Sequence, residues 1–200
     1  MTYTYNTVKQ MVLIMAIMSL SSTILVATPK LNSTIFERSM VFVCEHHEQG
    51  TVGLIINRPT SFGLNYICEQ LALDCSLSAQ RDMPLLFGGP IQPERGFVLH
   101  RPKGHWRSSL IINGDVTLTT SNDIIKAMAV NQGPDHVVIA LGYSGWEPKK
   151  LEEEIMDDLW LVCPFTRELL YDVSFASRWE HAGHLLGVNL ETIIGLSGHA

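Results

Sequence analysis

Cationic side chains are scarce in this sequence. Its 200 residues include 14 lysines and arginines against 20 aspartates and glutamates, a formal net charge of -6 with neutral histidines. Proteins that bind nucleic acid neutralise phosphates with clustered cations, so this balance disfavours direct nucleic-acid binding. Long apolar runs are also lacking. The stretch that begins at Met11 is interrupted by Ser19, Ser21 and Ser22, short of the roughly 20 apolar residues that cross a bilayer. We therefore expect no membrane association.

Cysteine is limited to four positions, and none has the Cys-x-x-Cys spacing of metal or redox sites. All four occur in apolar segments: Cys44, Cys68, Cys75 and Cys163. This is typical of reduced cysteines in cytosolic proteins. Histidines pair at 46–47 and at His181 and His184, but no third ligand follows at a recognisable spacing, and zinc requires three or four. We therefore expect a cytoplasmic protein with no metal and no cofactor.

The glycine-rich turns lack the motifs of phosphate sites and of serine nucleophiles. The GGP at 88–90 is part of neither a Walker loop nor a GxGxxG dinucleotide loop. We interpret it as a turn whose glycines supply a positive φ, with ligand contact as the alternative. The GYSG at 142–145 lies between a strand and a helix, but a nucleophile elbow needs GxSxG and Trp146 occupies the last position. Ser144 is therefore a poor candidate nucleophile.

The patterning that is present predicts short strands and a few amphipathic helices. Short apolar runs bounded by turn residues predict strands at 23–27, 39–44, 51–57, 85–87, 96–100, 109–112, 116–119, 136–142 and 159–163. The second and third strands should form a hairpin, and the four from 85 to 119 an antiparallel meander. Helices are expected at 60–73, 121–130, 148–158 and 178–186. Strands outnumber helices and only partly alternate with them, which favours an α+β fold.

Two of these helices carry more detailed expectations. The first should be capped by Thr60 or Ser61, since hydroxyl side chains accept hydrogen bonds from the first turn of a helix. In the helix at 148–158, the 3.6-residue period places Leu151 and Ile155 inward. The same period directs most of its acidic run to solvent: Glu153, Glu154 and Asp157.

Several blocks occur in a fixed order along the chain: ILVATPKL (24–31), VCEHHEQGTVGLIINRP (43–59), FGGPIQPERGFVLH (87–100), TLTTSNDII (117–125), LGYSGWEPKKLEEEI (141–155), LWLVCP (159–164), RWEHA (178–182) and the terminal GHA. Together they resemble the YqgE/AlgH family of bacterial proteins. The resemblance implies a mixed, largely antiparallel sheet that curls toward a barrel, with helices packed outside. The family's transcriptional-regulator label names no chemistry. Family members usually have Gly-Gln where this chain has Lys149 and Lys150, so any family ligand at that pair is altered here.

The resemblance begins near Met18, which bears on domain organisation. We interpret residues 1–17 as an upstream extension or a misassigned start, and expect translation to begin at Met18. Residues 18–200 should form one domain, because 46% hydrophobic and 17% charged residues suit a single sizeable core.

The best candidate anion site is the locally basic segment 95–107, RGFVLHRPKGHWR. Its cations could converge on a phosphate, a carboxylate or an acidic protein surface if they share one face of a hairpin: Arg95, Arg101, Lys103 and Arg107. A charged solvent face is the alternative. Together with the other family blocks, this segment supplies eight candidate ligand-binding residues: His46, Arg58, Gly88, Gly89, Arg95, His100, Trp146 and Glu152.

No nucleophile, base and orienting group form a recognisable set in the sequence, so catalytic residues stay unassigned. We expect a non-catalytic binding or regulatory protein for a small anionic ligand or an acidic protein partner, with an indirect effect on transcription. The alternative is an enzyme, redox or hydrolytic, with a pocket near the glycine-rich turns. The sequence leaves the oligomeric state open.

Overall fold

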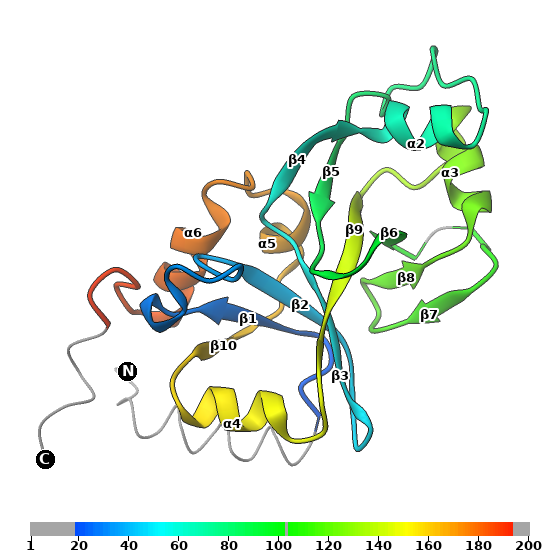
Figure 1. Ribbon diagram of the computed structural model, residues 1–200. Coiled ribbons are helices and arrows are strands. Elements are labelled where there is room, and N and C mark those ends of the chain that lie inside the picture. Colours follow the sequence, from blue (N-terminus) through cyan, green and yellow to red (C-terminus); the bar gives the residue numbers. More distant parts are fainter. Residues whose placement is uncertain (1–18, 103, 194–200) are drawn as a thin grey trace, which may run out of the picture.

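The computed structural model describes residues 19–102 and 104–193 (Figure 1). The expected N-terminal extension, 1–17, lies outside them. The strands are β1 (Thr23–Ala27), β2 (Met40–His47), β3 (Gly50–Ile55), β4 (Pro59–Gly63), β5 (Pro84–Phe87), β6 (Ile91–His100), β7 (Ser109–Ile111), β8 (Thr117–Thr119), β9 (Val137–Trp146) and β10 (Trp160–Pro164). The helices are η1 (Pro29–Leu31), α2 (Leu64–Gln70), α3 (Asn122–Ala129), α4 (Lys150–Met156), α5 (Arg167–Tyr171) and α6 (Arg178–Leu186).

The strands form one curled, mixed sheet in the order β10-β1-β2-β3-β9-β6-β8-β7. The long β9 runs through its centre, with β6 along one side and both β3 and β5 along the other (Figure 1). All of these pairings are antiparallel except that of β5 with β9, which is parallel. The α+β fold with a mixed, largely antiparallel sheet curling toward a barrel is confirmed, as is the hairpin of β2 and β3.

Three apolar clusters follow from this curl. The largest collects side chains from opposite parts of the sheet, including Phe42, Leu99 and Val138, and α5 and α6 pack on it through residues such as Trp179. A second cluster lies beneath α4, and a third lies beneath α2 and α3 (Figure 1). Helices α2, α3 and α4 thus cover the outer face of the sheet, and α5 and α6 pack on the largest cluster.

Two expectations about local structure are wrong. Thr60 and Ser61 do not cap a helix but belong to β4, which pairs with β5, and α2 begins only at Leu64. The expected meander also fails, because β5 pairs with β4 and β9 instead of β6, and β6 pairs with β8 instead of β7. In both cases long-range strand pairing overrides a local signal.

Candidate functional site

The structure separates the eight candidate residues into three places. Arg95 lines a cleft on the inner face of the curled sheet, and His100 lies beneath one wall of it. Three candidates surround the end of the β2–β3 hairpin: His46, Trp146 and Glu152. The other three lie where separate backbone segments contact one another: Arg58, Gly88 and Gly89.

The cleft that contains Arg95, called the Arg95 cleft below, has a volume of about 370 Å³. Its floor is apolar and aromatic. The rings of Phe97 and Tyr143 meet edge to face with centroids 5.7 Å apart. The complete lining combines these rings with aliphatic, hydroxyl and charged side chains: Glu45, Val52, Arg95, Phe97, Ser108, Ser109, Leu110, Leu118, Thr120 and Tyr143. An apolar cavity with a few polar groups is the usual form of a small-molecule site.

An irregularity in β6 brings Arg95 into the cleft. The β6–β9 ladder shifts its register between Ile91 and Gly96, so the intervening residues bulge out of the sheet. The Arg95 guanidinium lies 5.3 Å from the centroid of the Phe97 ring, and its Nη1 donates to the side-chain oxygen of Gln92 at 3.2 Å. The part of the chain that the structure describes supplies no carboxylate within ion-pair distance of this cation.

A bulge in β2 turns Glu45 toward the same cleft. The ladder pairs Val43 with Gly53 and then Glu45 with Val52, which makes Cys44 an extra residue. One inserted residue moves each following side chain to the opposite face of the sheet. Glu45 and Val52 therefore share the inner face and both line the cleft. Sequence reasoning missed Glu45, because the bulge depends on the partner strand and leaves no local motif.

His100 is buried behind the cleft wall. Its Nδ1 lies 2.8 Å from the Arg101 carbonyl oxygen and its Nε2 lies 2.9 Å from Thr119 Oγ1. A carbonyl only accepts, so Nδ1 carries the proton and Nε2 accepts from the Thr119 hydroxyl. Ser109 Oγ, on the cleft surface, lies 2.7 Å from Thr119 Oγ1. Burial lowers the pKa of the His100 imidazole from its ordinary value, which favours the neutral form that this chain of hydrogen bonds requires.

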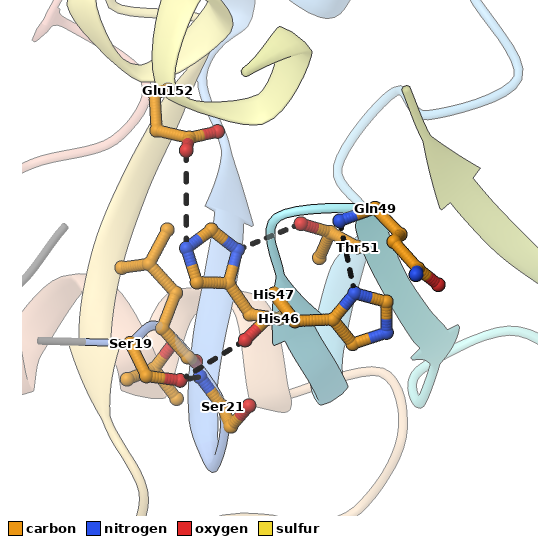
Figure 2. A network of polar contacts seen from close by, with 9 residues as sticks. Ser19, Ser21, His46, His47, Gln49, Thr51 and Glu152 are labelled. Carbon is orange, nitrogen blue, oxygen red and sulfur yellow. Dashed lines mark hydrogen bonds and ion pairs between the residues drawn. The ribbon is translucent and has the colours of Figure 1, made fainter. Parts of the chain in front are cut away.

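A second polar cluster occupies the hairpin end, on the α4 side of the sheet (Figure 2). His46 lies between two partners, with Nδ1 2.8 Å from Thr51 Oγ1 and Nε2 3.9 Å from Glu152 Oε1. Ser19 Oγ donates to the His46 carbonyl oxygen at 3.4 Å. Two predicted candidates, His46 and Glu152, are thus brought together. Thr51 is buried, so its hydroxyl serves the imidazole and is not open to a ligand.

Trp146 lies at the same end of the molecule but contacts Glu154 instead of Glu152. Its Nε1 donates to Glu154 Oε2 at 2.8 Å, and Trp160 Nε1 donates to the same oxygen at 2.9 Å. The expectation that Glu154 faces solvent is therefore wrong, because two indole N–H groups reach it across α4. Leu151 and Ile155 are buried, as expected.

The described cations of segment 95–107 do not all line one cleft. Arg95 lines its cleft, whereas Arg101 lines a separate hollow beside α5 with Tyr171. Lys103 lies outside the described residues. The Arg107 backbone N–H donates to Asp123, which places that residue at the start of α3. The convergence expected from hairpin alternation is wrong, and Arg95 alone of the described cations lines the cleft.

Among residues 19–102 and 104–193, no three His, Cys, Asp or Glu side chains gather in a way that could hold a metal ion. The cysteines at 44, 68, 75 and 163 are free and buried. Within the same residues, no helix combines the length and apolar character that crossing a bilayer requires.

A model of the AlgH-like family matches residues 24–191. The chain belongs to this family. The UPF0301 protein of Legionella pneumophila strain Lens is 52% identical over 184 residues, which cover 92% of this chain and 98% of the relative. The UPF0301 protein of Laribacter hongkongensis is 40% identical over 181 residues, 90% of this chain and 97% of the relative. These matches confirm the resemblance on which the fold expectation rested.

Solved structures show the same AlgH-like fold. The solution structure of the AlgH protein from Pseudomonas aeruginosa has a TM-score of 0.74 and 38% identity, and the match covers 90% of this chain and 96% of that one. The crystal structure of DIP2367 from Corynebacterium diphtheriae has a TM-score of 0.64 at 18% identity, covering 80% and 83% of the two chains, and supports the fold alone.

The two glycine-rich blocks of this AlgH-like chain meet at their backbones. The Gly88 carbonyl accepts from the Ile55 N–H at 2.9 Å, and a methyl group added at Gly88 would overlap the Gly142 carbonyl oxygen. Gly89 and Gly142 have φ values of +151° and +71°. The positive φ expected of the GGP segment is confirmed at Gly89, and its reason is the close passage of β9.

Arg58 and Ser144 are also engaged with the backbone. Arg58 Nη2 donates to the Glu37 carbonyl oxygen. Ser144 is fully buried, and its Oγ donates to the Gly88 carbonyl oxygen at 3.3 Å. A substrate could reach the Ser144 hydroxyl only if the core opened. Neither Arg58 nor Ser144 lines the Arg95 cleft.

Proposed function

We propose that this protein binds a small molecule in the Arg95 cleft, through a carboxylate or phosphate group held by Arg95. The observation that carries the proposal is a guanidinium with no carboxylate partner among the described residues, at the mouth of a cavity with an aromatic floor. Arginine presents a planar fork of N–H donors that matches carboxylate and phosphate oxygens. Contact with the Phe97 ring face orients this fork while leaving its charge unneutralised.

The rest of the cleft suits a ligand with an apolar body. Val52, Leu118 and the Phe97 ring supply the apolar surface, and the hydroxyl groups of Ser108 and Thr120 supply hydrogen bonds at the rim. A cavity of about 370 Å³ lies within the range of about 300 to 1,000 Å³ typical of small-molecule sites. This size favours a metabolite over the acidic surface of a protein partner, which would need a broad basic face.

A regulatory role would then follow from ligand occupancy. The net charge of -6 disfavours a direct contact with DNA, so any effect on transcription is indirect in this proposal. Weak or absent association with duplex DNA at low salt would support this view. Tight association that weakens steeply as salt rises would contradict it.

Thermal-shift and calorimetric titrations with a panel of small carboxylates and phosphate esters test the binding proposal. Arg95→Gln should abolish the stabilisation given by any ligand that the natural protein binds. Arg101→Gln is the matched control, since Arg101 belongs to the same segment but lines a different hollow, and it should bind normally. Equal loss in both variants, or no stabilisation by any compound, would overturn the proposal.

A second candidate, hydrolysis, is favoured by the hydrogen bonds from Ser109 through Thr119 to His100. Ser109 lines the cleft, and the neutral imidazole could accept a proton relayed from its hydroxyl through Thr119. The Trp106 carbonyl competes for the same Ser109 proton at 3.0 Å. A fluorophosphonate probe discriminates the two functions. Labelling that disappears in both Ser109→Ala and His100→Gln would support an enzyme, whereas an unlabelled protein that binds carboxylates would exclude this mechanism.

A further inference from the structure

Glu45 places a negative charge in the same cleft as Arg95. It comes from β2, whereas Arg95 comes from β6, and the two strands are separated in the sheet by β3 and β9. The bulge at Cys44 is what directs Glu45 inward, so its presence in the cleft is a property of the backbone and not of one flexible side chain.

The two charges lie in one cavity without neutralising each other. Among the described residues, neither side chain lies within 4.0 Å of an opposite charge in the cleft. One basic group among those residues lies within 4.0 Å of Glu45 Oε2: the imidazole of the exposed His47, whose Nε2 is 3.8 Å away. In the part of the chain that the structure describes, the Arg95 guanidinium contacts the neutral Gln92 amide and the Phe97 ring. The cleft therefore offers one anionic and one cationic binding group with an aromatic surface between them.

This arrangement selects among the ligands that Arg95 could hold. A dianion such as a phosphate monoester would be attracted by Arg95 and repelled by Glu45 in the same small cavity. A ligand that carries both a carboxylate and an ammonium group satisfies both charges at once, because each end meets a group of opposite sign. Resting on the function proposed above, we propose that the cleft binds an amino-carboxylate, with its carboxylate at Arg95 and its ammonium group at Glu45.

The apolar and aromatic surface of the cleft favours apolar carbon in the part of the ligand that joins its carboxylate and its ammonium group. Phe97 and Tyr143 present ring faces and edges to the cavity, which pack well on aliphatic or aromatic carbon. Because this surface lies between Arg95 and Glu45, the ligand class is an amino acid with an apolar spacer between its two charged groups. Because each charged group of the ligand has its own partner in the cleft, the loss of either partner should weaken binding.

Isothermal titration with matched compounds tests this. The panel pairs ω-amino acids of three to six carbons with the same carboxylates lacking the amine; 6-aminohexanoate with hexanoate is one such pair. The best amino-carboxylate should bind roughly 10- to 100-fold more tightly than its partner, as expected for a charge-assisted hydrogen bond. Glu45→Gln should remove that difference while leaving the affinity for the plain carboxylate unchanged or improved, and Arg95→Gln should weaken both compounds.

The outcomes separate this inference from the broader proposal. If plain carboxylates bind as tightly as their amino counterparts and Glu45→Gln has no effect, the amino-carboxylate inference is wrong while anion binding at Arg95 stands. If neither class binds, both fail. Glu48→Gln is the matched control for a change of surface charge, since Glu48 lies in the exposed turn beyond β2 and should leave both affinities as they are.

Discussion

Trp146 and Trp160 stand edge to face, with ring centroids 5.9 Å apart, and both donate their indole N–H to one oxygen of Glu154. This contact joins the end of β9, the helix α4 and the start of β10. It orders the end of the molecule where β9 passes beside the β2–β3 hairpin and the His46 cluster. Glu154, in the middle of the acidic run of α4, is therefore a structural residue.

Replacing Glu154 by alanine should lower the free energy of unfolding by about 2 to 4 kcal/mol, because two hydrogen bonds to a charged acceptor are lost and two indole donors are left without a partner. Urea unfolding followed by near-ultraviolet circular dichroism measures this, since the tryptophan signal should change with the stability. Glu153→Ala is the control on the same helix. Its carboxylate is exposed and pairs only with Lys150, so the loss should stay below about 0.5 kcal/mol; equal losses would contradict the structural role of Glu154.

Arg178 is a second polar residue with a structural role. It is 2% exposed, and its guanidinium donates to the carbonyl oxygens of Ile56, Leu170 and Val173 without a carboxylate partner in hydrogen-bond reach among the described residues. Burial lowers the pKa of this side chain to about 10, still far enough above neutrality to keep it charged. The three carbonyls come from β3's end, α5 and the segment before α6, so one side chain joins three separate parts of the chain.

Arg178→Met should cost about 3 kcal/mol or more of unfolding free energy, because two buried carbonyl oxygens and one partly buried carbonyl oxygen lose their donors while the apolar volume is retained. Chemical denaturation monitored by tryptophan fluorescence is the measurement. Arg167→Met provides the comparison, since Arg167 is exposed and only pairs with exposed Asp115 at 3.6 Å, and it should cost less than about 1 kcal/mol. If the two variants unfold at the same denaturant concentration, the buried hydrogen bonds contribute nothing measurable.

Much of the fold could be predicted because it is encoded locally. The apolar run of β1 has the bounds expected, 23–27, and α6 ends where Gly187 adopts a left-handed conformation with φ of +68°. The predictions that failed concern residues whose local structure depends on pairing with another strand. Thr60 is a good helix cap by type, yet its hydroxyl donates to the Leu85 carbonyl oxygen at 2.9 Å as part of the β4–β5 pair.

The candidate site was predicted only in part for the same reason. Arg95 could be selected as a cation in a family block, but it is separated from Arg101 because the two residues flank opposite ends of the regular part of β6, 96–100. Glu45 could not be selected, because an inserted residue in β2 decides the face on which it lies. Helical periodicity placed Leu151 correctly. It misplaced Glu154, because the helical period takes no account of the Trp146 and Trp160 indole groups that donate to this carboxylate.

The stability of the protein should depend on pH through His100. Burial lowers the folded-state pKa of His100 below its ordinary value of 6.5, so between those two values the unfolded chain binds more protons than the native state. Stability should therefore fall as the pH decreases through about 6.5, by at most about 1.4 kcal/mol per pH unit for one group, and level off below the folded pKa. Urea unfolding from pH 5 to 8 measures the slope.

The variant His100→Gln isolates that contribution from the other histidines. Glutamine keeps a donor and an acceptor for the Arg101 carbonyl and the Thr119 hydroxyl but does not titrate. The difference in unfolding free energy between the natural protein and the variant should shrink as the pH is lowered. Parallel pH curves for the two proteins would show that the burial of His100 does not oppose its protonation.

The close approach of the Gly89 and Gly142 backbones predicts a large difference in stability between substitutions at two glycines. Gly142 has φ of +71°, and a methyl group there would overlap the Gly89 carbonyl oxygen, whereas nothing lies within 4 Å of the corresponding position at Gly114. Gly142→Ala should lower the unfolding free energy by about 2 kcal/mol or more, because left-handed strain and backbone overlap act together. Gly114→Ala should change it by less than about 0.5 kcal/mol. Thermal unfolding by circular dichroism compares them, and similar midpoints would mean that the two glycine-rich blocks do not need to approach as closely as they do here.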